Sequence, residues 1–104
     1  YAASKFAVRG ITESVAHEVG VHGIRVNTIL PGGTDTRLLR DVIISRARMQ
    51  GRTEDEVART DYAAQSALGK LLEPSEIASV ALFLASETGS AITGTHLMVD
   101  GGRL

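Results

Sequence analysis

Cysteine is absent from this sequence, which excludes disulfide bonds and thiolate metal sites. This absence fits a reducing compartment, and we expect a cytoplasmic protein. A surplus of either charge is also missing, because 12 acidic and 11 basic side chains give a formal net charge of −1 and the two signs are interleaved. A nucleic acid or an anionic membrane binds a concentrated positive surface, so we expect neither partner.

Long hydrophobic runs, a signal peptide, low-complexity tracts and internal repeats are missing as well. The 104 residues are enough for one domain at most. The sequence begins with tyrosine rather than methionine, and its helical pattern starts almost at once, without a preceding strand for that helix to pack against. We therefore expect residues 1–104 to form a single partial domain, the C-terminal part of a longer protein.

A phenol and an ammonium group, Tyr1 and Lys5, stand four residues apart at the start of a helical pattern over residues 2–19. This spacing makes them neighbours on one helix face. A tyrosine works as a general acid and base only if its proton affinity falls toward neutral pH, and a nearby cation is the simplest cause. That change needs about 4 kcal/mol, whereas a solvent-exposed ion pair supplies about 1 kcal/mol or less. The pair therefore needs a closed cleft around it.

The residues of this first helix sort into faces when they are placed at about 100° per residue. One face is a branched apolar stripe formed by Val8, Ile11, Val15 and Val19. Tyr1 and Lys5 fall at the start of this stripe, so we expect them to point at a sheet edge rather than at bulk water. A second face carries small residues flanked by Phe6, namely Ala3, Ala7, Gly10 and Ser14. Another helix can approach such a face closely, either from the same subunit or from a second subunit.

Residues 24–30 are β-branched and largely apolar, which predicts a strand covered on both sides. A helix, a tight turn and a buried strand form the second half of a βαβ unit, so we expect a parallel sheet. Pro31, Gly32 and Gly33 end the strand and leave the backbone almost free of side chains. Ligands bind outside the carboxyl ends of strands in such sheets, which makes this loop a candidate ligand site.

Residues 34–70 form a long insertion between strands, of the kind that builds lids and binding walls. Asp35 or Thr36 is expected to cap a helix that runs to about Met49, and residues 53–56 fit a capping box that opens a second helix. The candidates for an apolar substrate pocket are Leu38, Leu39, Ile43, Met49 and Tyr62. Met49 and Tyr62 are equally compatible with filling the hydrophobic core.

Pro74 at a first helical position predicts a helix to about Ser86, and residues 95–99 predict the last strand. The expected buried face of this helix comprises Ile77, Val80, Ala81 and Leu84. The predicted order is helix, strand, long helical insertion, helix and strand. This order fits an α/β protein, the C-terminal part of a doubly wound, Rossmann-like parallel sheet.

A Tyr-x-x-x-Lys pair alone is a weak signal, but it stands here within an ordered set of motifs. These are Tyr1-Ala-Ala-Ser-Lys5, Gly23-Ile-Arg-Val-Asn27, Pro31-Gly32 with Thr36, Ile92-Thr-Gly94 and Val99-Asp-Gly-Gly102. Together they resemble the C-terminal half of the short-chain dehydrogenase/reductase family, in its compact single-domain branch. The resemblance covers essentially all 104 residues.

The resemblance implies a role for each matching position. Tyr1 corresponds to the catalytic acid/base, and Lys5 to the residue that binds the nicotinamide ribose and favours deprotonation of the tyrosine. The loop of Pro31, Gly32, Gly33 and Thr34 corresponds to the backbone that meets the nicotinamide carboxamide, and Thr36 to a hydroxyl near the cofactor. The implied cofactor is NAD or NADP, the implied substrate a small carbonyl compound or alcohol, and the implied assembly a homodimer or homotetramer.

Two functional hypotheses follow. The first is an oxidoreductase that transfers a hydride between NAD(P) and a carbonyl or alcohol. The alternative is a non-catalytic fragment or assembly piece, because in this family the glycine-rich turn and the remaining catalytic residues precede the tyrosine. Asn27 is open to a backbone-binding or a catalytic role, with the first favoured. His17, His22 and His96 share no ligand spacing, so we expect no metal site.

Overall fold

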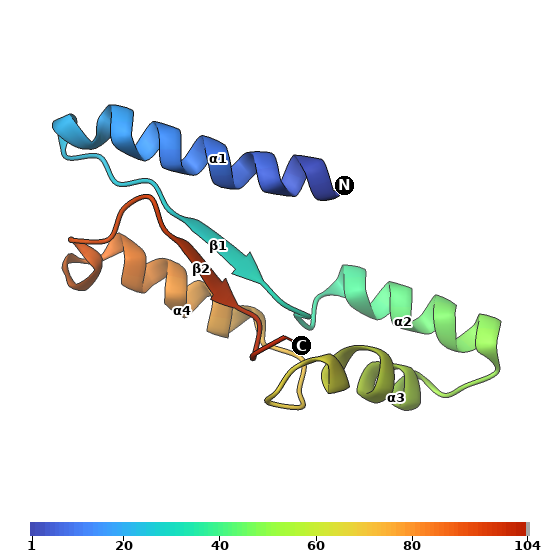
Figure 1. The fold of residues 1–104 in the computed structure, drawn as a ribbon. Coiled ribbons are helices and arrows are strands. Elements are labelled where there is room, and N and C mark those ends of the chain that lie inside the picture. Colours follow the sequence, from blue (N-terminus) through green and yellow to red (C-terminus); the bar gives the residue numbers. More distant parts are fainter. Residues whose placement is uncertain (104) are drawn as a thin grey trace. The chain divides into compact units, whose positions relative to one another are not determined.

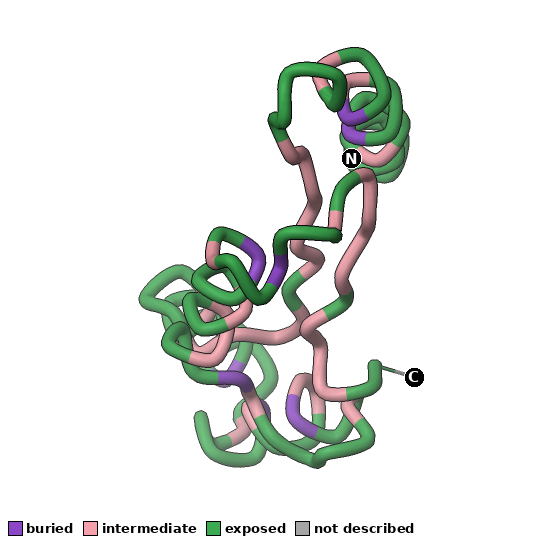
Figure 2. Tube along the Cα trace, turned by 90° about the vertical axis from the view of Figure 1, so that its left-hand side faces the viewer, coloured by how far each residue is buried: buried purple, intermediate pink, exposed green. Residues whose placement is uncertain are grey.

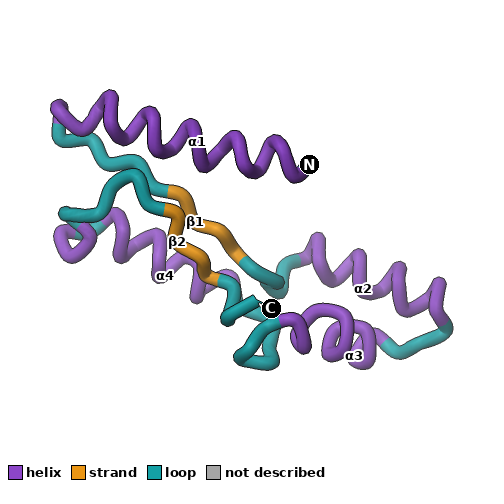
Figure 3. Tube along the Cα trace, in the orientation of Figure 1, coloured by secondary structure: helices purple, strands orange, loops and turns teal. Residues whose placement is uncertain are grey.

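The computed structural model describes residues 1–103. Its helices and strands follow the predicted order (Figures 1 and 3). They are α1 (Ala2–Val19), β1 (Thr28–Pro31), α2 (Arg37–Gln50), α3 (Glu54–Val57), α4 (Pro74–Ala85) and β2 (His96–Val99). The described chain divides into two compact units, which are treated separately below: the first comprises residues 1–30 and 79–98, and the second residues 31–78 and those from 99 onward.

The two strands β1 and β2 form a parallel pair, as predicted. The amide of Thr28 donates to the carbonyl of Thr95 at 2.9 Å, and the amide of Gly32 donates to the carbonyl of Val99 at 2.9 Å. In both bonds the two partners are the same number of residues apart in the sequence, which is the register of a parallel pair. Three of the four β1 residues are half-buried and the fourth is exposed, so the prediction of a strand covered on both sides is wrong for the described residues.

The strand predicted over residues 24–30 begins only at Thr28. Before this point, side-chain and backbone hydrogen bonds together hold the segment. The amide of Val26 donates to Oγ1 of Thr93 at 3.1 Å, while the Val26 carbonyl accepts from Gly94 at 2.7 Å. The segment is therefore held beside its neighbour without the regular pairing that defines a strand.

Helix α1 contacts the strands along one edge of the predicted apolar stripe, where Val15 and Val19 are half-buried. Its buried residues are Thr12 and Ala16, whereas Val8 and Ile11 of the apolar stripe are 46% and 61% exposed. Ala16 faces Gly94, where an added Cβ atom would be in ordinary van der Waals contact, 3.5 Å from the Cβ of Ala16. The small residues Ala3, Ala7, Gly10 and Ser14 lie on the other side of the helix and are exposed, like most of α1 (Figure 2).

Helix α4 begins at Pro74 as predicted and ends at Ala85. Ile77 and Val80 are half-buried and Leu84 is buried, but Ala81, expected on the same face, is exposed. Ile77, Val80 and Leu84 have the three- and four-residue spacing of one helix face, whereas Ala81 lies about 100° around the helix from Val80. Within the first unit, α1 and the 79–85 part of α4 lie on opposite sides of the strands (Figure 1).

Arg25 connects the end of α4 to the segment before β1. Its Nη1 donates to the carbonyls of Leu84, Gly89 at 2.9 Å and Ile92 at 3.4 Å. The last carbonyls of a helix lack partners within it and carry partial negative charge. The guanidinium group satisfies one of them and fixes the connection that leads to β2.

The second unit is built on a hydrophobic cluster of Ile43, Ala47 and Val57. Leu39, Ala58, Tyr62 and Leu71 pack against it. The predicted helix caps are confirmed: Oγ1 of Thr36 accepts from the Leu39 amide, and Thr53 forms a reciprocal capping box with Glu56. The second helix is shorter than its cap suggests, because α3 widens into a π-helical turn over Ala58–Tyr62.

Candidate functional site

Tyr1 and Lys5 are in contact at the start of α1. Lys5 Nζ lies 5.4 Å from the centroid of the Tyr1 ring, and the Tyr1 carbonyl accepts from the Lys5 amide at 3.1 Å, which opens the helix. The predicted neighbour relation is thus present. Tyr1 is 96% exposed in the described residues, but at about 100° per residue it lies on the same side of α1 as Thr12, which contacts β1.

The chemistry of this pair depends on its surroundings. A lysine ammonium group beside a phenol favours the phenolate, but in water an exposed charge pair is worth about 1 kcal/mol or less. The described residues therefore supply an acid/base group and its cation without a dry cleft. A closed wall around them would strengthen the interaction several-fold.

The Pro31–Thr34 loop lies at the carboxyl end of β1 and belongs to the second unit. Gly32 has no room for a side chain, since a Cβ there would lie 2.6 Å from the Cα of Asp100. On the next residue, the carbonyl of Gly33 accepts from the Leu72 amide at 2.8 Å. Neighbouring backbone thus holds the loop, and its own backbone carries almost no side chains, which suits a close approach by a ligand.

Two hydroxyl groups belong to the same loop. Oγ1 of Thr34 donates to the Gly32 carbonyl at 3.1 Å, and Oγ1 of Thr36 accepts from the Leu39 amide at 3.3 Å. A hydroxyl that accepts one bond can still donate another, so Thr36 can cap α2 and bind a ligand at once. Thr34 and Thr36 therefore remain candidates for polar contacts beside the bare backbone.

The two sets of candidate residues fall in different units. Tyr1 and Lys5 come together in the first unit. Pro31, Gly32, Gly33, Thr34 and Thr36 come together within a few residues of sequence in the second.

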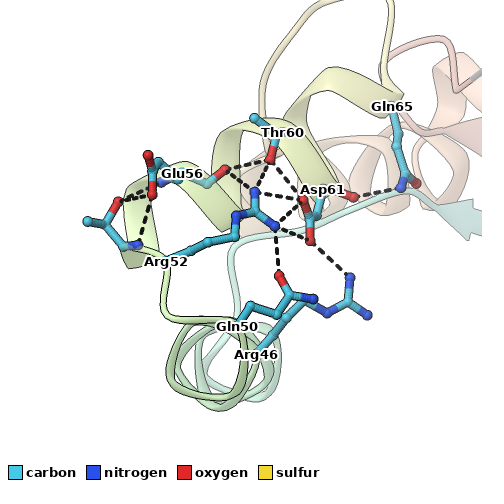
Figure 4. Close-up of polar contacts among 8 residues, drawn as sticks. Arg46, Gln50, Arg52, Glu56, Thr60, Asp61 and Gln65 are labelled. Atoms are coloured by element: carbon cyan, nitrogen blue, oxygen red, sulfur yellow. Dashed lines mark hydrogen bonds and ion pairs between the residues drawn. The ribbon is translucent and has the colours of Figure 1, made fainter.

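The sequence did not predict a cluster of hydrogen bonds and ion pairs around Asp61 in the insertion, here called the Asp61 node (Figure 4). The Asp61 carboxylate accepts from both terminal nitrogens of Arg52 at 3.1 Å, from Arg46 at 3.2 Å and from the Thr60 hydroxyl at 2.8 Å. These donors, Arg52 first, lower the pKa of Asp61 to about 2. The node ties the end of α2 to the π-helical turn. No regular spacing of residues in the sequence predicts the Asp61 node, because the chain reverses direction between Arg52 and Asp61.

The five residues predicted to line one apolar pocket are divided between two sides of α2. Leu39, Ile43 and Tyr62 belong to the hydrophobic cluster. Leu38 and Met49 are 77% and 85% exposed and line a shallow hollow on the other side. The single pocket is therefore wrong. Positions 39 and 43 share a helix face, whereas 38 and 49 lie about 110° around the helix from that face.

Asn27 bonds the backbone, as the favoured interpretation holds. Its Nδ2 donates to the Ile92 carbonyl at 2.9 Å, and its Oδ1 accepts from the Thr95 amide at 3.1 Å. His96 pairs with Glu13, Nε2 to Oε1, at 2.8 Å. Within residues 1–103 no three histidine or acidic side chains gather as they would around a metal ion. None of the helices in that range is long and apolar enough to cross a membrane.

Known proteins match this chain almost from end to end. A family profile described as enoyl-(acyl carrier protein) reductase matches residues 1–103. D-beta-hydroxybutyrate dehydrogenase of Rhizobium meliloti (strain 1021) is 38% identical over 102 residues, 98% of this chain and 40% of that protein.

Solved structures agree in fold. The crystal structure of a short chain dehydrogenase family protein from Francisella tularensis subsp. tularensis SCHU S4 matches with a TM-score of 0.92 and 35% identity, over 97% of this chain and 41% of that chain. L-sorbose reductase from Gluconobacter frateurii, complexed with NADPH and L-sorbose, has a TM-score of 0.91 and 26% identity, over 98% and 39%. The chain spans about two fifths of the length of these relatives.

Proposed function

Because the chain belongs to the short-chain dehydrogenase/reductase family, we propose that the full-length protein transfers a hydride between NAD or NADP and a carbonyl or alcohol substrate. The observation that carries this proposal is the contact between Tyr1 and Lys5 at the start of α1. The match of a dehydrogenase and a reductase to the same residues supports both directions of the reaction.

Tyr1 is the general acid and base in this proposal. Its Oη gives a proton to the carbonyl oxygen during reduction and takes a proton from the alcohol during oxidation. Lys5 favours the phenolate that oxidation requires, through its positive charge beside the ring. After each reduction the Tyr1 phenolate regains a proton from water, and after each oxidation the phenol releases its proton to water, which completes the proton balance.

A bound dinucleotide would supply or accept the hydride. The residues that would hold it are Lys5 at the ribose and the backbone from Pro31 to Thr34, with Thr36, at the carboxamide. The loop fits such a role because Gly32 and Gly33 present backbone without side chains and are held in place by Asp100 and Leu72. Structural relatives bound to NADPH and to NADH support the choice of cofactor class.

The substrate in this proposal is a small molecule with a hydroxyl or carbonyl group, as the names of the matched hydroxybutyrate dehydrogenase and sorbose reductase indicate for those proteins. We further propose a homodimer or homotetramer. The small residues Ala3, Ala7, Gly10 and Ser14 are all exposed along α1 and would let a second helix approach closely. Sedimentation equilibrium of the full-length protein tests this, and a monomer at micromolar concentration would contradict it.

The decisive experiment is Tyr1→Phe in the full-length protein, with Tyr62→Phe as its control. Both substitutions remove one hydroxyl, and phenylalanine preserves the contact between the Tyr62 ring and Arg46. We expect Tyr1→Phe to lower kcat by at least about 1000-fold with little change in thermal stability, since general acid–base catalysis contributes about 100- to 10,000-fold. Equal rates for the two variants would overturn the catalytic assignment.

The isolated 104-residue chain is a different case. It contains the acid/base pair but about two fifths of the length of its relatives. We propose that it is inactive by itself, because Tyr1 is 96% exposed and residues 1–103 form no closed cleft around the pair. In this proposal the fragment hypothesis applies to the isolated chain, and the oxidoreductase hypothesis applies to the full-length protein.

A further inference from the structure

Thr12 is a buried polar residue on α1, only 5% exposed. Its Oγ1 donates to the Val8 carbonyl at 2.8 Å, one turn back along the helix. The same oxygen lies 2.6 Å from Oγ1 of Thr28 in β1. Since a hydroxyl has one proton, Thr12 uses it on Val8, and the Thr28 hydroxyl donates to Thr12. The bond from β1 to α1 therefore has a defined direction as well as a short length.

Thr12 shares its helix face with the acid/base pair. It follows Tyr1 by eleven residues and Lys5 by seven, which at about 100° per residue places both within about 20° of its direction. The helix between them is unbroken from Ala2 to Val19. The direction in which Thr12 is held consequently determines the direction in which Tyr1 and Lys5 leave the helix.

The other contacts between α1 and the strands define that direction less well. Ala16 packs against Gly94, and apolar contacts between such small groups permit the helix to roll. The Glu13 side chain reaches His96, but it is 62% exposed, so this pair is screened by water. The bond between Thr12 and Thr28 combines burial with directionality.

We propose that Thr12 is a positioning residue, whose hydroxyl bond to Thr28 sets the roll of α1 and thereby aims Tyr1 and Lys5 at the reacting groups. This inference rests on the proposed function of the pair. Thr12 touches neither substrate nor cofactor and acts only through the helix. A loss of the bond lets the helix turn, and a shift of about 1 Å at a catalytic group can cost about 100-fold in rate.

The test compares Thr12→Val with Thr12→Ser in the full-length protein. Valine retains the branched shape and removes the hydroxyl, whereas serine retains the hydroxyl. We expect Thr12→Val to lower kcat about 10- to 100-fold and to move the midpoint of the pH–rate profile for alcohol oxidation upward, because the rolled helix moves the pair out of the closed cleft in which Lys5 assists Tyr1 most strongly. Thr12→Ser should restore most of both properties. Thr28→Val should reproduce the valine effect, and the double variant should be no slower than either single one.

Thr53→Ala is the matched stability control. It removes a helix cap in the second unit, which lowers the melting temperature, and it leaves α1 untouched. We expect this variant to melt earlier with an unchanged pH–rate midpoint. If Thr12→Val behaves in the same way, with a lower melting temperature and the wild-type midpoint, Thr12 is purely structural and the proposal is wrong. Additive losses in the double variant would also contradict it.

Tyr1→Phe separates this proposal from the one on which it rests. An active Tyr1→Phe enzyme overturns the catalytic role of the pair and the positioning role of Thr12 with it. An inactive Tyr1→Phe enzyme together with a fully active Thr12→Val enzyme overturns the positioning role alone. Circular dichroism of each variant shows whether a loss of rate reflects a loss of helix.

Discussion

The two units of this chain differ in how far they provide their own core. The second unit buries Ile43, Ala47 and Val57 against each other and adds the Asp61 node at its edge. In the first unit, α1 buries Thr12 and Ala16, while Val8 and Ile11 remain exposed. The insertion thus carries its own stabilising contacts, and the helix with the acid/base pair leaves its apolar stripe for something else to cover.

The largest effect that this contrast predicts concerns the isolated chain. We expect it to give no turnover of alcohols with NAD or NADP and to associate in solution, because exposed apolar residues along α1 and the open edges of a two-stranded sheet favour self-association. Nicotinamide absorbance and analytical ultracentrifugation measure the two properties. A monomer with a cooperative melt, or turnover that disappears in Tyr1→Phe, would contradict this expectation.

Val57→Ala tests whether the second unit has a core of its own. Val57 is fully buried, so the substitution should reduce the free energy of unfolding by about 2 kcal/mol through lost burial and the cavity left behind. Val42→Ala is the matched control, since Val42 on α2 is 42% exposed, and it should cost less than about 0.5 kcal/mol. Urea denaturation of the full-length protein gives both values. Similar losses for the two variants would mean that the cluster is not a core.

The Asp61 node adds an acid-sensitive contribution to the same unit. Its pKa is lowered from 3.8 to about 2 by bonds from Arg52, Thr60 and Arg46, so the folded state holds the carboxylate charged more strongly than the unfolded state does. The resulting stability is complete above about pH 4 and is lost as the pH falls toward 2. We expect Asp61→Asn to be less stable than the wild type at pH 7 and equally stable near pH 2. Urea midpoints across this range check it, and a constant difference would contradict it.

Much of this arrangement could be predicted from local sequence. The caps at Thr36 and Thr53, the start of α4 at Pro74 and the parallel pairing all follow from residue types and their spacing. The start of β1 could not be predicted, because side chains of Asn27 and Thr93 replace ladder bonds in a stretch that has ordinary strand composition.

The candidate site was predictable in its residues and less so in its setting. The contact between Tyr1 and Lys5 follows from one helical turn of spacing. The exposure of Tyr1 does not follow from the helix pattern, because the pattern places Tyr1 on the same side of α1 as the buried Thr12. The partnership of Thr12 with Thr28 is non-local, because a threonine in a helix pattern carries no mark of the strand that it will meet.

The close approach at Gly32 has a practical consequence for work on this protein. Asp100 occupies the space that a side chain at position 32 would need, at 2.6 Å from a Cβ to its Cα, and the Val99 carbonyl accepts from the Gly32 amide. The residues that follow β2 therefore form the back wall of the proposed carboxamide-binding loop. Truncation before Asp100 would leave that loop without its support, so any shortened form of the protein intended for cofactor-binding studies needs to retain the residues that follow β2.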